Sequence, residues 1–498
     1  MLLASILSAL FVAVPAFGLE ESSFEAESMS YGTWGSQLTD TWAEANCSAG
    51  ACLQYNADGT ATKTVTTTMT VDKIQVIARK ADASTGTVNI NVSVDGVAQT
   101  AQKVSALDTN KTMRAYTFPV SVPAGTHTIG VIGSSLGGTY NDGLITDVVH
   151  FLAADDCNKY ASPTGADTNA GTFNAPFKTA EKLANSLSAG QTGCIKAGTY
   201  YESDRTVNIS RGGTSSARNT LMRAPGETEP ARINARINVE STADYLTLKD
   251  LRMDGSYSPD CSSGASCSRL PSPTINGAYV HLINNDISSR RPGAESTKAG
   301  ICINAGTTDK IYGLVIESNK IHHCGRIPSS NHDHGIYLSN TRDTTIKNNL
   351  MYENADRAVQ MYPDADRTLI EGNVMAYNGD GIHFSGKGTK TSIDNVARNN
   401  VVTHSKLDYN IDSYAGQLDP GVSFPGPDSP YRNEAYNNCV YGGASSPSTG
   451  GVEETSSTAI DYFYTSGNVI ADPLYANPSA FDYRVGASSE CRSVYSGP

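Results

Sequence analysis

Apolar and polar residues alternate in short runs through the first third of the chain. Alternation with a period of two places one face of each strand in a core and the other face in water. Turn residues separate the runs at roughly ten-residue spacing, which is typical of an antiparallel sandwich. The runs are TATKTVTTTMTV, DKIQVIARKA, GTVNINVSVDG, RAYTFPVSV and GTHTIGVIGSS. The pattern predicts a β-sandwich over residues 22–152.

The pattern changes after residue 155. One amphipathic helix is predicted at 177–187, and asparagine then recurs before apolar pairs, at Asn285, Asn319, Asn349, Asn373, Asn400 and Asn468. The intervals between Asn349, Asn373 and Asn400 are 24 and 27 residues. A period of this length with short strands predicts a parallel β-helix over residues 155–498, in which stacked coils share one core. We interpret the asparagines as a structural ladder along one turn.

A second strand of each coil aligns as the runs GICINA, GIYLSN, AVQMYP, GIHFSG and NIDSYA. Alternation predicts that one set of side chains points into the core, namely Ile336, Leu338, Val359, Met361, Ile382 and Phe384. The opposite set then points outward, namely Tyr337, Ser339, Gln360, Tyr362, His383, Ser385, Asp412 and Tyr414. Just before these strands lie His334, Arg357, Asp380 and Tyr409.

Neighbouring coils lie about 4.7–4.9 Å apart, so these outward side chains form one continuous surface. We call His334, Arg357, Asp380, His383 and Asp412 the charged patch. Asp333, Tyr337 and Lys387 flank it in the sequence. Clustered groups of mixed charge shift one another's pKa values, which favours a catalytic site over an ordinary polar face.

The formal net charge is −13, and no block of Lys or Arg interrupts the sequence. Nucleic acid is therefore excluded as a partner, because affinity for it rests on clustered cations. Residues 1–18 form an apolar run that ends in small residues, which predicts a signal peptide and a secreted protein; an N-terminal membrane anchor is the alternative. We expect a monomer that needs no membrane.

Ten cysteines fall as neighbours along the chain, and an even count in a secreted protein favours disulfides. The number of cysteines does not determine their connectivity, and we predict pairing between sequence neighbours. The pairs are Cys47 with Cys52, Cys157 with Cys194, Cys261 with Cys267, Cys302 with Cys324, and Cys439 with Cys491.

The segments FEAESM, GTHTIGV and GLITDVVHF resemble the β-sandwich carbohydrate-binding modules of families six and thirty-five. This resemblance implies a structural Ca²⁺ held by the carboxylates of Glu25, Glu27 and Asp147. It also implies a sugar site, for which the candidates are Tyr31, Trp34, Trp42 and Asn141. The alternative for the two tryptophans is an ordinary place in the core.

The segment from KYASPTGADTNAGTFNAPFKT to GTYYES resembles the entry into the right-handed parallel β-helices of the pectate-lyase-like superfamily. Together with a sugar-binding module, this resemblance implies a secreted enzyme acting on a polysaccharide. Tyr362 and Tyr414 are then further candidates for sugar contacts.

The first reaction that fits these groups is β-elimination on a uronic-acid polymer, by a polysaccharide lyase. Arg357 would neutralise the uronate, His334 or His383 would remove the C5 proton, and Tyr337 or Tyr362 would protonate the leaving oxygen. Lys387 and Lys406 are alternative bases. A catalytic Ca²⁺ on Asp333, Asp356 and Asp380 would be an alternative means of neutralisation.

The second reaction is glycoside hydrolysis, which needs two carboxyl groups. Asp380 and Asp412 would supply them, with Asp333 or Asp408 as substitutes. The coil pattern also resembles mannuronan C-5 epimerases, although His-Asp-His at 332–334 stands where those enzymes have Asp-Pro-His. The remaining alternative is a non-catalytic glycan-binding surface protein.

Overall fold

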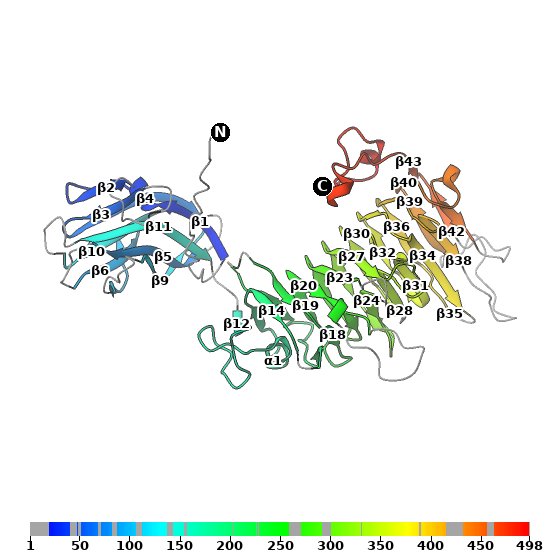
Figure 1. Ribbon diagram of the computed structural model, residues 1–498, viewed down its shortest axis with the longest axis horizontal. Coiled ribbons are helices and arrows are strands. Elements are labelled where there is room, and N and C mark those ends of the chain that lie inside the picture. The colour runs from blue at the N-terminus through cyan, green and yellow to red at the C-terminus, as the bar shows by residue number, and fades with distance from the viewer. Residues whose placement is uncertain are drawn as a thin grey trace, which may run out of the picture. The chain divides into compact units, whose positions relative to one another are not determined.

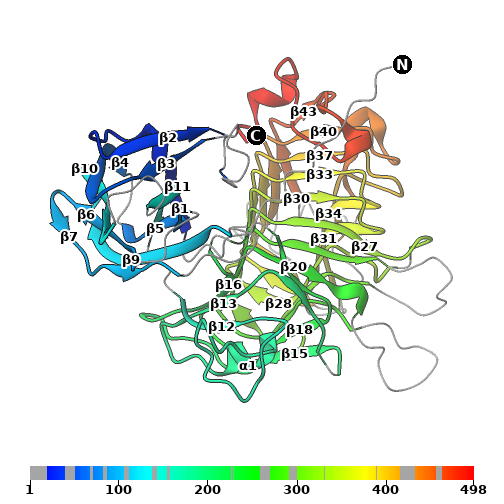
Figure 2. The same cartoon turned by 60° about the vertical axis from the view of Figure 1, so that its left-hand side comes forward.

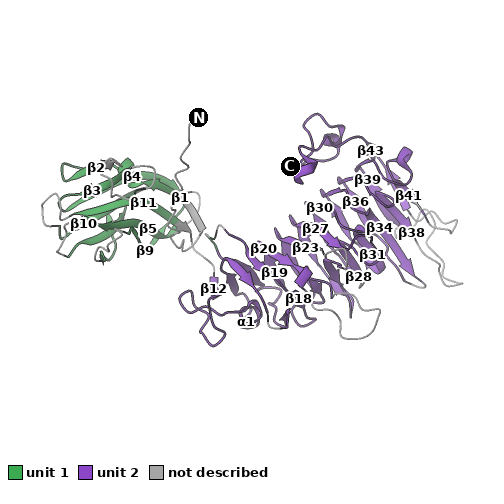
Figure 3. Cartoon of the chain, in the orientation of Figure 1, with its two compact units in different colours: residues 1–156, 225–227 green, residues 157–224, 228–498 purple. Residues whose placement is uncertain are grey.

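The computed structural model describes residues 19–497 except 40–46, 48–50, 68–70, 82–86, 106–111, 137–142, 154–156, 203, 226, 228, 258–269, 291–299, 330, 388–389, 415–431 and 456–462. The chain divides into two units, residues 1–156 with 225–227 and residues 157–224 with 228–498 (Figure 3). The predicted signal peptide lies outside the described residues. Among the described helices, none has the length and apolar character of a membrane span.

The first unit is the predicted antiparallel sandwich (Figure 1). One sheet has the order β2 (Gly35–Thr39), β3 (Ala51–Tyr55), β11 (Leu144–Ala153), β5 (Val71–Lys80) and β9 (Arg114–Val122), with β1 (Leu19–Glu25) paired to β11. The other has the order β4 (Gly59–Thr67), β10 (Gly125–Ser134), β6 (Asn89–Val94) and β7 (Val97–Ala98), with β8 (Gln102–Lys103) paired to β6. The inward faces of both sheets meet in one core, which includes Ile74, Val76, Ile90 and Val131.

The second unit is a parallel β-helix of three sheets, in which successive coils stack one above another (Figure 2). Sheet 1 contains β12 (Cys157–Ala161), β13 (Thr192–Ile195), β16 (Asn219–Arg223), β19 (Leu246–Lys249), β22 (His281–Ile283), β26 (Val315–Glu317), β29 (Thr345–Lys347), β32 (Leu369–Glu371), β36 (Val396–Arg398), β39 (Asn433–Tyr436) and β42 (Phe463–Ser466). Sheet 2 contains β14 (Gly198–Tyr200), β17 (Ala231–Ile233), β20 (Leu251–Asp254), β23 (Asp286–Arg290), β27 (Lys320–Gly325), β30 (Leu350–Tyr352), β33 (Val374–Ala376), β37 (Val401–Thr403), β40 (Cys439–Tyr441) and β43 (Val469–Ile470).

Sheet 3 carries the residues of the charged patch. It contains β15 (Thr206–Ile209), β18 (Arg236–Val239), β21 (Thr274–Ile275), β24 (Ile303–Ala305), β28 (Ile336–Arg342), β31 (Arg357–Asp366), β34 (Asp380–Lys387), β38 (Ile411–Tyr414) and β41 (Val452–Glu454), with β25 (Ile311–Tyr312) and β35 (Lys390–Thr391) paired at its edge. Short 3₁₀ turns occur in both units, namely η1 (Ala26–Ser28), η4 (Gly255–Tyr257), η5 (Pro447–Thr449), η6 (Pro478–Ala480) and η7 (Glu490–Ser493).

The predicted inward column of sheet 3 is confirmed, because Ile336, Leu338, Val359, Met361, Ile382 and Phe384 are all buried in the core of the β-helix. Each such side chain contributes about 1.5–3 kcal/mol relative to an exposed position. The predicted helix is shorter than expected and forms α1 (Ala180–Asn185). The Thr179 hydroxyl accepts a hydrogen bond from the Lys182 amide and caps the helix, so the preceding residues, including Phe177, stay outside it.

The asparagine ladder is confirmed and is longer than predicted. Each side-chain oxygen accepts hydrogen bonds from the backbone and side-chain amides of the preceding asparagine, along Asn285, Asn319, Asn349, Asn373, Asn400, Asn438 and Asn468. The sequence analysis missed Asn438, because 38 residues separate it from Asn400 and break the period. Two shorter ladders join Asn354 to Asn378 and Asn395 to Asn433.

The C-terminal segment packs on the outer side of sheet 2 and forms a second apolar cluster outside the solenoid. Tyr483, Val485 and Tyr495 pack there with Tyr352 and Val374, and these side chains are almost fully buried. The disulfide between Cys439 and Cys491 ties the segment to β40.

Four predicted disulfides are confirmed, namely Cys47–Cys52, Cys157–Cys194, Cys302–Cys324 and Cys439–Cys491. Cys261 and Cys267 lie outside the described residues. Four disulfides in one chain are typical of proteins from an oxidising compartment.

Replacing one ladder asparagine should destabilise the β-helix. In Asn373→Ala, the Asn349 backbone N–H and the Ile346 carbonyl each lose a hydrogen bond, and Nδ2 of Asn349 keeps only its bond to the Ile316 carbonyl. We therefore expect a loss of roughly 2–3 kcal/mol and a lower Tm. Differential scanning calorimetry would measure the change in Tm. Asn174→Ala, at an exposed bend, is the control and should leave Tm unchanged; equal Tm values for the two variants would contradict a structural role for the ladder.

Candidate active site

The register of sheet 3 brings the charged patch together as predicted. Tyr337 of β28 pairs with Gln360 of β31, which pairs with His383 of β34, which pairs with Asp412 of β38. Three residues earlier, at the start of β31 and β34, Arg357 pairs with Asp380. Because parallel strands place paired residues side by side, six polar side chains from four coils share one face.

Arg357 joins two carboxylates of adjacent coils. Its Nη1 lies 3.3 Å from Oδ2 of Asp356, and its Nε lies 3.6 Å from Oδ2 of Asp380. Nη1 also donates a hydrogen bond to the side-chain oxygen of Asn331. The positive charge of Arg357 is thus shared between two acidic groups.

Asp380 has the most perturbed carboxyl group of the patch. Burial, opposed by Arg357 and reinforced by the negative charges of Asp356 and Asp412, raises its pKa from 3.8 to about 7. Its Oδ1 is buried and has no hydrogen-bond partner in the described structure. The geometry therefore presents a carboxyl group that holds a proton near neutral pH and has one oxygen unpaired.

His334 is a neutral imidazole at the edge of the patch. Burial, together with the nearby guanidinium of Arg357, lowers its pKa well below the usual value, although Oδ2 of Asp356 lies 3.3 Å from its Nδ1. The ring of Tyr337 stacks on His334 at 5.5 Å between centroids, and burial raises the pKa of Tyr337. Burial likewise raises the pKa of Asp356.

His383 and Asp412 form a closely spaced pair. Nδ1 of His383 lies 2.9 and 2.8 Å from the two carboxylate oxygens of Asp412, and the Thr455 hydroxyl donates to one of them at 3.3 Å. These contacts fix the orientation of the imidazole and of the Asp412 carboxyl group.

Most of the patch is shielded from water. His334 is 1% exposed, Asp380 5%, Asp412 6% and His383 8%. Asp333 is fully buried, and its Oδ1 accepts hydrogen bonds from the amides of Gly300 and Arg326. These bonds give Asp333 a structural role that the sequence pattern did not reveal.

Other predicted residues lie at the margin of this centre. Lys387 is exposed at the end of β34, and Tyr414 is partly exposed and pairs in register with Ser385. Tyr362 is also partly exposed, on β31. Lys406, an alternative base, pairs instead with Glu353 at 2.6 Å. The sequence analysis missed Asn331 and Thr455, which lie outside the repeated strand positions.

In the sandwich, Trp34 stacks on Tyr55 at 4.6 Å and packs against the core, whereas Tyr31 is 38% exposed. Trp42 and Asn141 lie outside the described residues.

The carboxylates predicted to hold calcium in the sandwich are Glu25, Glu27 and Asp147. Among the described residues, the ligand atoms of Glu25, Glu27 and Asp147 do not gather within 4.8 Å of one another; Asp147 lies instead beside the Cys47–Cys52 disulfide. Oε2 of Glu27 is buried and has no hydrogen-bond partner in this part of the chain. The described carboxylates of the charged patch also form no such group of three, so calcium at either place stays a prediction.

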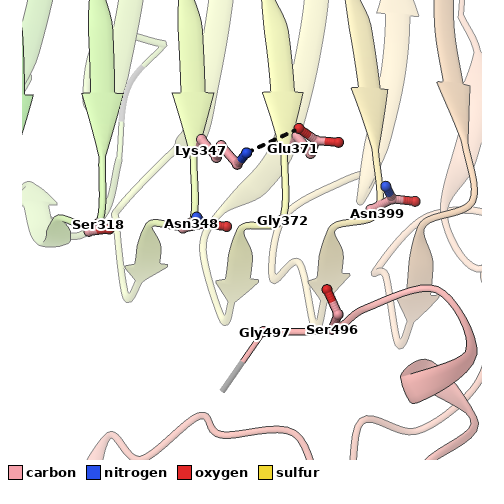
Figure 4. A pocket seen from close by; sticks show the side chains of 8 residues that line it. All are labelled: Ser318, Lys347, Asn348, Glu371, Gly372, Asn399, Ser496 and Gly497. Atoms are coloured by element: carbon pink, nitrogen blue, oxygen red, sulfur yellow. Dashed lines mark ion pairs between the residues drawn. The ribbon is translucent and has the colours of Figure 1, made fainter.

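A separate pocket of about 640 Å³ lies between the turns after sheet 1 and the C-terminal segment (Figure 4). Its lining includes Lys347 and Glu371, which pair at 3.7 Å, and Asn348, Asn399 and Ser496. No residue of the charged patch lines this pocket. The candidate catalytic centre is therefore the charged patch on sheet 3, and the pocket is separate from it.

Comparison with known proteins identifies the architecture. Residues 252–418 match the family model of a right-handed β-helix region. No curated protein matches the chain. One similar solved structure is a variant of the catalytic domain of a GH87 alpha-1,3-glucanase in complex with nigerose, with 13% sequence identity over 90% of this chain and 88% of that chain and a TM-score of 0.34. Another is the Agl-KA catalytic domain, with 11% identity over 91% of this chain and 98% of that chain and a TM-score of 0.26. A third is the carbohydrate-binding module CBM36 in complex with calcium and xylotriose, with 17% identity over 26% of this chain and 98% of that chain and a TM-score of 0.21.

The raised pKa of Asp380 predicts how stability depends on pH. Between pH 3.8 and about 7 the folded protein retains a proton that the unfolded chain releases, so this group's contribution to stability falls as the pH rises through that range. Asp380→Asn removes the dependence. We expect the Tm of the variant, relative to the native protein, to be higher at pH 8 than at pH 5. A Tm difference that is the same at both pH values would contradict the shifted pKa.

Proposed function

We propose that the chain is a glycoside hydrolase of the right-handed β-helix fold and that the charged patch is its catalytic centre. The observation that carries the proposal is the contrast between Asp380 and Asp412 on adjacent coils. Burial raises the pKa of Asp380 to about 7, whereas the carboxylate oxygens of Asp412 lie within hydrogen-bond distance of His383 and Thr455. Hydrolysis of a glycosidic bond requires one carboxylic acid and one carboxylate.

In this mechanism Asp380 acts as the general acid and gives its proton to the glycosidic oxygen. Asp412 supplies the second carboxylate, as base for a water molecule or as nucleophile. His383 orients Asp412, and Arg357 stabilises the carboxylate that Asp380 becomes after the proton has left.

The charge of the patch supports a substrate that is neutral at the cleaved bond. Asp356 and Asp380 both contact Arg357, so the positive charge of this guanidinium is already shared between two carboxyl groups. A uronate at this position would have to compete with both for the same cation, which favours a neutral sugar there.

Elimination by a polysaccharide lyase is the second candidate. It is favoured by one specific arrangement, the neutral imidazole of His334 stacked on the Tyr337 ring beside Arg357. A base, a proton donor and a cation are the groups that elimination needs.

We further propose that the sandwich binds glycan and holds the polymer near the enzyme. The supporting observation is the exposed ring of Tyr31 next to Trp34, at 6.2 Å between centroids. Tyr31→Ala should lower retention of the full-length protein on insoluble polysaccharide while leaving the rate on a soluble trisaccharide unchanged. Unaltered retention would contradict a sugar site at this position.

A panel of neutral polysaccharides (α- and β-1,3-glucan, xylan, galactan) and uronates (polygalacturonate, alginate) tests the reaction class. Hydrolysis gives new reducing ends without ultraviolet absorbance, whereas elimination gives both. We expect hydrolysis of a neutral polymer, with a rate that falls as the pH rises through about 7, because Asp380 then loses its proton.

Substitution of the two carboxyl groups tests the assignment. Asp380→Asn and Asp412→Asn should each lower kcat by about 10²–10⁴-fold, the range expected for loss of an acid or base. Asp394→Asn, in a turn on another side of the β-helix, is the matched control and should keep full activity. Full activity in all three variants would overturn the site, and binding without turnover would favour the non-catalytic class.

A further inference from the structure

Sheet 3 extends its outward column well beyond the charged patch. Toward the N-terminal coils, Tyr337 pairs with Asn304, Asn304 with Thr274, Thr274 with Asn238, and Asn238 with Asn208. These side chains carry amides and hydroxyls in place of the acidic groups of the patch. Amides and hydroxyls both donate and accept hydrogen bonds, as the hydroxyl groups of a sugar do.

Two polar atoms along this face have no protein partner. Among the described residues, Oδ1 of Asn304 and Nε of Arg236 are buried and make no hydrogen bond. Buried polar atoms in folded proteins nearly always have partners, so these two exceptions distinguish the face from an ordinary polar surface.

Arg236 lies at the far end of the face, at the start of β18. Its Nη2 donates to the neutral side chains of Asn238 and Thr274, both at 3.3 Å, and it forms no ion pair with any described carboxylate. An arginine in this setting offers donors in a fixed fork to oxygen atoms of a ligand.

Two exposed aromatic rings lie in the turns that lead into sheet 3 at its N-terminal coils. Tyr201 is 64% exposed and Tyr257 is 43% exposed, and their ring centroids lie 5.9 Å apart. Tyr201 follows β14 and Tyr257 closes η4 after β20, so both lie in the turn from sheet 2 to sheet 3. In a later coil, the corresponding turn between β27 and β28 carries His334. Rigid rings with a polar tip suit a ligand that has both apolar faces and hydroxyl edges.

The distance between Arg236 on β18 and the charged patch on β34 sets the length of a ligand that could contact both. Five strand spacings separate β18 from β34 in the order of sheet 3 (Figure 1), which corresponds to roughly 24 Å at about 4.8 Å per spacing. A disaccharide held at Asp380 cannot reach Tyr201, whereas a polymer chain lying across the strands can.

We propose that the outward face from β18 to β24, with Tyr201, Tyr257 and Arg236, is a remote binding site for the glycan polymer cleaved at the charged patch. The inference rests on the proposed function and extends it, because the enzyme then acts within long chains and prefers them to short oligosaccharides. Asn304 on β24 binds hydroxyl groups between the aromatic pair and the catalytic centre.

The test compares chain lengths in the full-length protein. The double variant Tyr201→Ala/Tyr257→Ala should raise KM about tenfold for the polymer of the panel that is hydrolysed fastest, with kcat nearly unchanged. For the trisaccharide of the same polymer, kcat/KM should stay at the native value, which also verifies folding. Tyr279→Ala/Tyr312→Ala removes two similarly exposed tyrosines elsewhere on the β-helix and should alter neither substrate.

Unchanged KM for the polymer, or an equal change for polymer and trisaccharide, would overturn the remote site while leaving the proposed hydrolysis intact. Failure of the native protein to cleave any polymer would instead overturn the proposed function. In that event affinity electrophoresis in gels containing each polymer decides the remote site. If Tyr201→Ala/Tyr257→Ala is retarded less than Tyr279→Ala/Tyr312→Ala, the remote site is supported. Equal retardation of the two double variants overturns the remote site.

Discussion

The side-chain amides of the asparagine ladder set the geometry on which the rest of the β-helix depends. An amide such as that of Asn373 accepts two hydrogen bonds from the coil before it and donates one to the coil after it. Because the ladder is buried, each of these bonds is costly to lose, and neighbouring coils are therefore held in a single register. The inward stack of Ile336, Val359 and Ile382 supplies apolar burial, which by itself does not select a register.

A fixed register has an electrostatic consequence on the opposite side of the sheet. Residues that are 23 to 29 positions apart in the chain, such as Gln360, His383 and Asp412, are forced to be neighbours. Carboxyl groups gathered in this way cannot move apart to relieve their repulsion, and burial removes the water that would screen it. The rise in the pKa of Asp380 is a direct result, so the scaffold that stabilises the fold also prepares a proton donor.

Repetition explains what could be predicted from the sequence. The inward and outward sets of sheet 3, the ladder and the alternating strands of the sandwich follow from periods of two and of about 23–27 residues. The prediction failed where periodicity ends. Asn438 follows a long insertion, Asn331 and Thr455 contact the patch from irregular segments, and the burial of His334 depends on packing that no local pattern encodes.

The C-terminal segment shows how a single covalent bond can control the surface of a solenoid. Tyr352 and Val374 lie on the outer side of sheet 2, and Tyr483, Val485 and Tyr495 cover them in a segment that the Cys439–Cys491 bond anchors to β40. Reduction would release an apolar strip along several coils, and such strips promote self-association. The cystine thus links the cover of this apolar strip to the oxidising conditions in which disulfides persist.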